Sequence, residues 1–266
     1  AISPSTRLIL VGDKDQLPSV GPGMVLGDLL ELHKLPKVVL NRIFRQEANS
    51  DIPYNAHRIL NGQMPEFTRD TNFHIREHQH ADQAQDLVKR FVSQEIPKFF
   101  KVHPMKDIQV LSPMRKGALG TIELNKVLQS ALNSDSPEFK IQGIPYHLGD
   151  KLMQIRNNYD KNIYNGDIGY LHKVDPKSKT FEVIFDEIVE YEYSEADELT
   201  LAYATTIHKS QGSEYPIALI VLDTSHRIML QRNLVYTAIT RAKSRVFLIS
   251  PMQCIQMCVE DHRVLN

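Results

Sequence analysis

The stretch IALIVLDTSHRIMLQRNLVYTAITRAKSRVFLI, residues 217–249, decides the fold class. An apolar run, Ile217–Leu222, opens it, and a second run, Val246–Ile249, closes it. Runs of this kind are typical of strands that are buried on both faces. Between them, Asn233–Ala242 has apolar residues at helical spacing. A strand, a helix and another strand in this order predict two parallel strands, because the helix carries the chain back to the start of the sheet.

The same alternation of strands and helices extends toward the N-terminus. Short apolar runs predict three further strands, at Leu8–Val11, Val38–Leu40 and Ile108–Leu111. Segments with periodic apolar positions predict helices at Met24–His33, Ala81–Phe91 and Ala118–Leu132. The predicted fold class is therefore α/β, with a parallel sheet flanked by helices on both sides.

The stretch 149–199 interrupts this alternation. Apolar and polar residues alternate there, which predicts strands at Lys151–Arg156, Asp167–Val174, Phe181–Phe185 and Ile188–Tyr193. Turn signals separate them at Asn165-Gly166 and Asp175-Pro176-Lys177. We expect a small antiparallel β-barrel inserted into the α/β domain. From Glu182 to Glu198 there are eight acids and no bases. We therefore do not expect this face of the barrel to bind phosphate, although its other faces could.

Composition restricts the class of protein. The 266 residues, 42% of them hydrophobic, are enough for one large or two modest domains with buried cores. No apolar run approaches the ~20 residues of a membrane-spanning helix. The N-terminus has no signal-peptide pattern, and with two cysteines we expect a cytoplasmic protein without a membrane partner. The net charge of −1 neither supports nor excludes nucleic acid as a partner, because binding to nucleic acid needs a basic groove, not a basic total.

The two cysteines, Cys254 and Cys258, are four residues apart in a predicted helix. This spacing puts them on one face, where two zinc ligands could lie. A structural zinc site needs four ligands, and no second pair has a suitable spacing. We therefore favour two small buried residues over a metal site, and we expect no metal ligands in the chain.

The first motif with chemical potential is Gly12-Asp13-Lys14-Asp15-Gln16-Leu17-Pro18, directly after a predicted strand. Loops at the carboxyl ends of parallel strands are where α/β proteins bind ligands. A glutamine there can orient a water molecule or contact a terminal phosphate. The alternative is a polar connecting loop, and the motif alone does not decide between them.

The second motif, Arg42-Ile43-Phe44-Arg45-Gln46, also follows a predicted strand. Arginine is suited to a two-pronged contact with phosphate. Taken alone, a pair of solvated arginines is the better interpretation.

The third motif, residues 205–214, reads TTIHKSQGSE. Hydroxyl, imidazole, ammonium and amide groups are dense in it. Such groups suit contacts with the phosphates and sugars of a nucleic acid strand. A single histidine or lysine would be ordinary surface, but this density favours binding.

The fourth motif, residues 236–243, reads YTAITRAK and lies between a predicted helix and a predicted strand. Arg241 could act as an arginine finger on a transferred phosphoryl group. Alternatively, it only closes the helix and interacts with the helix dipole.

In this order, the motifs resemble those of superfamily 1 helicases, most closely the RecD-like branch. GDKDQLPSVGPG resembles motif III, LNRIFRQ motif IV, YATTIHKSQGSEY motif V and LVYTAITRAK motif VI. The resemblance covers almost the whole chain and implies two RecA-like motor domains with ATP between them. It divides the chain into the end of a first motor domain (1–36), a second motor domain (37–148 and 200–266) and a barrel similar to a Src-homology-3 domain (149–199).

The resemblance also implies roles for individual residues. Gln16 would couple the terminal phosphate to domain closure, and Arg45 and Arg241 would reach that phosphate. The expected nucleotide-binding residues are Gly12, Asp13, Gln46, Gly212 and Glu214. The expected DNA-binding residues are Thr206, His208, Lys209 and Ser210. ATP, Mg²⁺ and single-stranded DNA are the implied cofactors and partner, with 5′ to 3′ movement in recombination or repair, alone or with other exonuclease subunits.

Two motifs of the family are missing from the sequence. The phosphate loop GxxxxGK[ST] does not occur, and no Asp-Glu pair that could hold a metal ion precedes Gly12. We therefore expect a chain that needs a further motor domain and does not hydrolyse ATP alone. Two alternatives are a non-catalytic nucleic-acid-binding or scaffolding module and an RNA helicase of the same superfamily.

Overall fold

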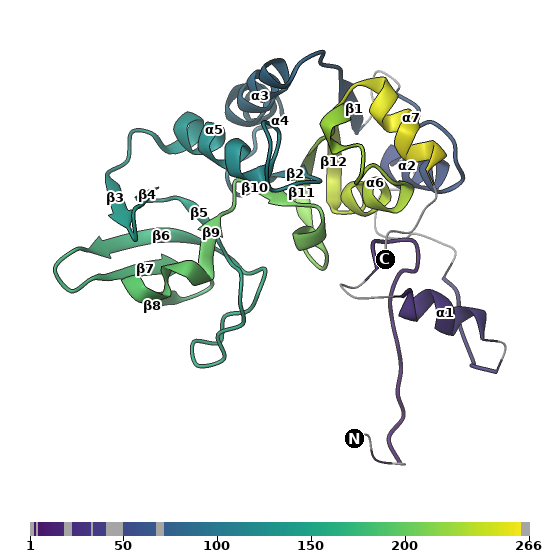
Figure 1. Cartoon of the computed structure of the whole chain (residues 1–266), viewed down its shortest axis with the longest axis horizontal. Helices are drawn as coiled ribbons and strands as arrows, with labels where there is room; N and C mark the ends of the chain where they lie inside the picture. Colours follow the sequence, from purple (N-terminus) through teal and green to yellow (C-terminus); the bar gives the residue numbers. More distant parts are fainter. Residues whose placement is uncertain are drawn as a thin grey trace.

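The computed structural model describes residues 3, 5–18, 23–32, 34–40, 50–67 and 72–261. Its centre is a five-stranded sheet with the order β1-β12-β11-β2-β10, in which all neighbouring strands are parallel (Figure 1). The strands are β1 (Phe73–Arg76), β2 (Ile108–Ser112), β10 (Ala204–Thr206), β11 (Tyr215–Val221) and β12 (Ala242–Ile249). The predicted parallel sheet is thus confirmed.

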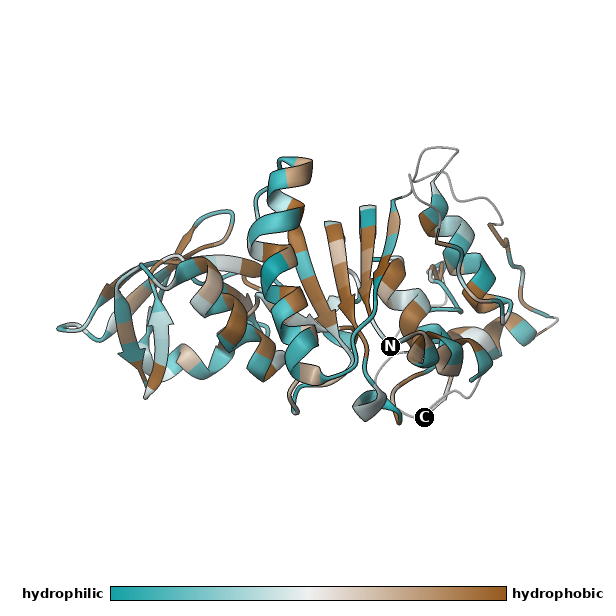
Figure 2. Ribbon diagram, turned by 90° about the horizontal axis from the view of Figure 1, so that it is seen from above, coloured by the Kyte–Doolittle hydropathy of each residue, from teal (hydrophilic) through white to brown (hydrophobic). Residues whose placement is uncertain are grey.

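Helices cover both faces of this sheet because its central strands are apolar on both sides. Ala218 and Ile220 of β11 belong to one buried cluster, and Leu219 between them belongs to the other. One face packs against α2 (Asp51–Leu60), α6 (Arg232–Ile239) and α7 (Met252–Glu260). The other packs against α3 (Ala81–Arg90), the π-helix η1 (Phe91–Glu95), α4 (Ile96–Phe100) and α5 (Thr121–Asn133). Figure 2 shows largely hydrophobic strands in the sheet and a mixture of hydrophobic and hydrophilic residues along the helices.

A second, antiparallel sheet lies between α5 and β10 in the sequence, with the strand order β8-β7-β6-β5-β9. Its elements are β5 (Lys151–Gln154), β6 (Ile168–Asp175), β7 (Thr180–Ile184), β8 (Ile188–Glu192), the 3-10 helix η2 (Tyr193–Glu198) and β9 (Leu199–Leu201). A hairpin, β3 (Glu138–Ile141) and β4 (Ile144–His147), contributes Ile141 and Tyr146 to the same core. The expected antiparallel strands are therefore present. We call this part of the molecule the barrel.

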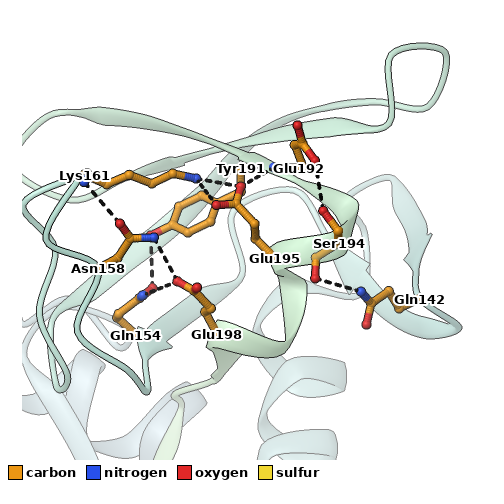
Figure 3. Close-up of polar contacts among 9 residues, drawn as sticks. All are labelled: Gln142, Gln154, Asn158, Lys161, Tyr191, Glu192, Ser194, Glu195 and Glu198. Atoms are coloured by element: carbon orange, nitrogen blue, oxygen red, sulfur yellow. Dashed lines mark hydrogen bonds and ion pairs between the residues drawn. The ribbon is translucent and has the colours of Figure 1, made fainter.

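Part of the acidic run in the barrel has a structural role (Figure 3). Glu195 accepts hydrogen bonds of 2.7 and 2.6 Å from the ammonium of Lys161. Glu198 accepts from the side-chain amides of Gln154, at 2.8 Å, and Asn158, at 3.1 Å. These contacts fasten the connection between β5 and β6 to η2, so these two carboxylates stabilise the fold.

A buried carboxylate joins the barrel to the main domain. Asp150 is fully buried, and its oxygens accept hydrogen bonds from Gln129 and Asn133 of α5, at 2.6 and 2.8 Å. They also accept from the Tyr203 hydroxyl and the His147 backbone amide, both at 2.8 Å. A buried charge is stable only when it is fully hydrogen-bonded, and Asp150 meets that condition.

Two predicted strands do not form. Leu8–Val11 has no strand partner among the described residues, and its side chains are exposed, Val11 by 93%. Val38–Leu40 is also exposed and forms no strand. A buried parallel strand needs neighbours on both sides, and the described part of the chain provides none here. The helix α1 (Val25–Glu31) between these segments has no buried residues.

Other differences concern shorter elements. The sequence analysis missed β1, β9, β10, the β3–β4 hairpin, α2 and α4, and it placed Ala242 in a helix although it begins β12, while the helix predicted around Cys254 and Cys258 is present as α7. Cys254 and Cys258 are both fully buried in α7 and belong to a core cluster, as predicted. Among the described residues, no helix has the length and apolar character needed to cross a membrane.

Candidate nucleotide and DNA site

The loop that carries Gln16 is attached to the main domain by residues of motifs V and VI. The backbone amide of Leu17 donates a 2.8 Å hydrogen bond to the Thr237 hydroxyl of α6. The carbonyl of Leu17 accepts a 2.7 Å bond from the side-chain amide of Gln211. Leu17 is buried in the core cluster that includes α2, α6 and α7. Motifs III, V and VI therefore meet at Leu17.

Arg241 lies at the turn between α6 and β12 and is only 5% exposed. Its Nε donates to the Thr237 carbonyl at 3.2 Å, and its Nη1 donates to the Ser213 carbonyl at 3.0 Å. Its Nη2 donates to Oε1 of Gln16 at 3.2 Å. The guanidinium is thus held by its own helix and by motif V, and it reaches the motif III glutamine.

Asp13 forms the other side of this cluster. Its Oδ2 accepts a 3.1 Å hydrogen bond from the Gln16 amide and a 2.9 Å bond from the Tyr236 hydroxyl. Its Oδ1 accepts from the backbone amide of Asp15 at 3.0 Å. Burial raises the pKa of Tyr236 above its ordinary value, and the Asp13 carboxylate raises it further, so this phenol stays a hydrogen-bond donor. We refer to Asp13, Gln16, Tyr236 and Arg241 as the motif cluster.

Three other predicted nucleotide-binding residues lie around this cluster. Gly12 precedes Asp13 and is exposed. Gly212 has φ +83°, a conformation that favours glycine, and it forms the turn before Ser213. Glu214 lies 3.7 Å from the ammonium of Lys243, carboxylate to nitrogen. Arg45 and Gln46 lie outside the described residues.

The predicted DNA-binding residues follow β10 and form its end and the short helix η3 (His208–Ser210). Burial lowers the pKa of His208, so the imidazole is neutral near pH 7. Burial also lowers the pKa of Lys209, and the charge of Arg115 adds to this effect. The Thr206 hydroxyl accepts from the Lys209 backbone amide at 3.3 Å, which helps to shape the turn.

Ser210 differs from this group. It is fully buried, and its hydroxyl donates a 2.7 Å hydrogen bond to the carbonyl of Ile207. The side chain therefore holds the turn in place, and a direct contact with DNA stays a prediction. The sequence motif gave no indication of this structural role, because serine is common on both surfaces and tight turns.

A cavity of about 420 Å³ lies beside these residues, between the main domain and the barrel. Thr206 and Lys209 line it from motif V, and Arg115 and Lys126 add two further cations. Barrel residues Ile155 and Asp197 line the opposite part. The cavity therefore extends the motif V surface toward the barrel.

The structure identifies residues that sequence reasoning did not single out. Gln211, Tyr236 and Thr237 hold the motif III loop through side-chain hydrogen bonds. All three lie inside motifs that the sequence analysis quoted. Their hydrogen-bond partners could not be predicted from the sequence, because these bonds join residues that are about 200 positions apart.

Comparisons with known proteins agree with this arrangement. The family model for the ATP-dependent RecD-like DNA helicase SH3 domain matches residues 124–185. The UvrD-like helicase C-terminal domain matches residues 201–249, and an AAA domain matches residues 1–81. The ATP-dependent RecD2 DNA helicase of Deinococcus radiodurans is 36% identical over 93% of this chain and 33% of its own length. The chain belongs to the RecD-like helicases of superfamily 1.

More distant relatives extend the comparison of this RecD-like chain. The RecBCD enzyme subunit RecD of Mycolicibacterium smegmatis is 26% identical over 99% of this chain and 49% of its own length. The chain thus spans between a third and a half of these curated relatives. A crystal structure of Pif1 helicase from Bacteroides, in complex with ADP-AlF3 and ssDNA, has a TM-score of 0.54 at 19% identity, covering 93% of this chain and 62% of that chain. This likeness shows a shared fold.

Proposed function

We propose that this chain is the second motor domain, with its barrel, of an ATP-dependent DNA helicase or translocase. The observation that carries the proposal is the hydrogen bond between Arg241 and Gln16, at 3.2 Å. It brings together the two described residues for which the family resemblance implies a role at the terminal phosphate of ATP. Each alone has an ordinary structural explanation, but their meeting with Asp13 and Gly212 nearby fits one wall of a nucleotide site.

The residues present fit ATP on one side only. Arg241 would contact the terminal phosphate, Gln16 would report its presence to the neighbouring domain, and Glu214 would contact the nucleotide sugar. Bound ATP supplies the free energy of phosphoanhydride hydrolysis. The phosphate-loop lysine and the Mg²⁺ ligands, which the 266 residues do not supply in the family's motifs, would come from a first motor domain. The proposed domains are 1–36, 37–148 with 200–266, and 149–199.

Single-stranded DNA is the proposed track. Lys209 and Thr206 line a cavity that continues to the barrel, and His208 lies between them in the sequence. Contacts of this kind with phosphates and sugars position a strand without reading its sequence. By the resemblance to RecD-like enzymes, movement would be 5′ to 3′, in recombination or repair, by a helicase that works alone or with other exonuclease subunits.

The test uses the longer protein, in which this chain follows a RecD-like first motor domain with a phosphate loop. We expect ATPase activity that single-stranded DNA stimulates, and Arg241→Ala should lower kcat by ~10³-fold or more while DNA binding remains. Arg227→Ala, an exposed arginine before α6, is the matched control. The isolated 266 residues should show no appreciable turnover.

Each alternative has its own outcome in this experiment. Activity that Arg241→Ala leaves unchanged would contradict the proposed role of Arg241. DNA binding without any stimulated turnover in the longer protein would favour a non-catalytic module. Stimulation by RNA that equals or exceeds that by DNA would favour an RNA helicase, since such discrimination depends on contacts to the 2′-hydroxyl.

A further inference from the structure

The orientation of the Gln16 amide is chemically determined on both of its sides. A guanidinium has only hydrogen-bond donors, so Arg241 can accept no bond and must meet the carbonyl oxygen of Gln16. A carboxylate has only acceptors, so Asp13 must meet the NH₂ group of Gln16. The two contacts agree on one orientation, and a flipped amide would oppose like groups on both sides.

Tyr236 fastens the carboxylate that selects this orientation. Its hydroxyl donates to Oδ2 of Asp13, the same oxygen that accepts from Gln16. The other carboxylate oxygen is held by the backbone amide of Asp15. Asp13 therefore cannot rotate without losing a bond to α6 or to its own loop. Tyr236 and Arg241 are five positions apart, so one helix end holds both sides of Gln16.

We infer that Asp13 and Tyr236 are positioning residues that hold the Gln16 amide with its carbonyl toward Arg241. The inference deepens the proposed function, on which its kinetic part rests. An anion has only acceptors, so it can bind Gln16 only through the NH₂ group that Asp13 holds in the present arrangement. The NH₂ group has two N–H donors, so a phosphate would either take the second one while Asp13 keeps the first, or displace Asp13 by exchange. Asp13 and Tyr236 would define the starting state in either case.

The direct test needs no nucleotide. In the 266-residue chain, the side-chain amide resonances of Gln16 are followed by nitrogen-15 NMR. Tyr236→Phe and Asp13→Ala should both move these resonances toward those of a solvent-exposed glutamine amide. The control is Tyr203→Phe, which removes another buried tyrosine hydroxyl bonded to an aspartate, Asp150, at the joint with the barrel. This variant should lose stability but leave the Gln16 resonances in place.

Kinetics in the longer helicase provide the second readout. Tyr236→Phe should lower kcat for DNA-stimulated ATP hydrolysis about fivefold, the size expected for one hydrogen bond, with a smaller change in KM for ATP. Tyr191→Phe, which removes the bond from a buried tyrosine hydroxyl to Gln154 within the barrel, should leave kcat unchanged. Gln16 resonances that stay in place in both folded variants, or kcat that Tyr236→Phe leaves unchanged, would overturn the inference. Wild-type protein without ATPase activity would instead count against the proposed function, while the NMR result would still decide the orienting role.

Discussion

Nη2 of Arg241 lies 3.2 Å from Oε1 of Gln16, and the two residues are 225 positions apart in the sequence. Two further bonds support this contact, from Leu17 to Thr237 and from Gln211 to Leu17. The loop of motif III is therefore attached to the domain of motifs V and VI by direct hydrogen bonds. Its attachment can be tested separately from catalysis.

Replacement of Thr237 by valine should release the motif III loop. The variant keeps the shape of the side chain but leaves the buried amide of Leu17 without its acceptor, which costs about 1–3 kcal/mol. Trypsin should then cleave after Lys14 at least several-fold faster than in the wild type, since local opening controls such cleavage. Thr180→Val, a matched change on the barrel strand β7, should not alter the rate. Equal rates in all three proteins would show that this bond does not hold the loop.

Lys209 should contribute to the salt dependence of DNA binding. Each phosphate contact with a single strand changes the slope of log K against log salt by about 0.7. Lys209→Ala should weaken binding of a short oligodeoxythymidine and reduce the slope by that amount. Lys177→Ala removes one charge in the turn between β6 and β7 and serves as the control. A slope that is the same for both variants would remove Lys209 from the proposed DNA surface.

Asp150 should be among the most sensitive positions for stability. Asp150→Ala leaves four hydrogen-bond donors at the joint without their acceptor. Because several buried groups lose partners, we expect the free energy of unfolding to fall by about 3 kcal/mol or more. Urea unfolding measures this loss, and Asp160→Ala, an exposed acid in the barrel, should change it little. A loss as small as that of Asp160→Ala would mean that water replaces the carboxylate.

Lys151 predicts a pH dependence of stability. Burial lowers the pKa of this lysine from 10.5 to about 7, and Asp107 opposes part of that shift. Lys151 begins the barrel strand β5, and its ammonium contacts Oε1 of Gln109 in β2 at 2.9 Å. Between pH 7 and 10.5 the unfolded chain therefore binds a proton that the folded chain does not, so this group makes stability rise with pH in that interval. Below pH 7 both states are protonated, and the folded state carries the cost of the buried charge.

The size of this effect is bounded by one proton, about 1.4 kcal/mol per pH unit. Lys151→Met should flatten the rise between pH 7 and 10, measured by urea unfolding at several pH values. Lys177→Met, an exposed control, should keep the wild-type slope. A slope in Lys151→Met identical to that of the wild type would assign the pH dependence to other groups.

The elements that could be predicted are those in which a few consecutive residues show the hydrophobic pattern of a buried strand or helix. The apolar residues 217–221 of β11 and the apolar half of β12 form continuous runs, β2 is an apolar run interrupted by Gln109, and β7 alternates with period two. The strand β1, with the sequence FHIR, is short and stands at one end of the strand order among the described residues. The strand β10 consists of small residues inside motif V. The sequence analysis interpreted these residues as ligand contacts and predicted no strand there.

Leu8–Val11 is the opposite case, a predicted strand that does not form. Its sequence has the pattern of a buried strand, but burial is a property of neighbours, and the described chain provides none for it. The candidate site was predictable in part, since motif order indicated that Gln16 and Arg241 would act together. The supporting bonds of Gln211, Tyr236 and Thr237 were not, because they depend on how distant segments meet. The bond from the buried Ser210 hydroxyl to the Ile207 carbonyl was also not predicted, because the motif alone does not distinguish a ligand contact from a turn.

The barrel leaves the main domain after α5 and returns at β10, so two covalent connections, one on each side of Asp150, link it to the sheet. A body tethered at one point can swivel, but one tethered at two points beside a shared buried anchor turns mainly about the line that joins them. The two connections and the bonds of Asp150 together restrict the directions in which the barrel can turn relative to the sheet.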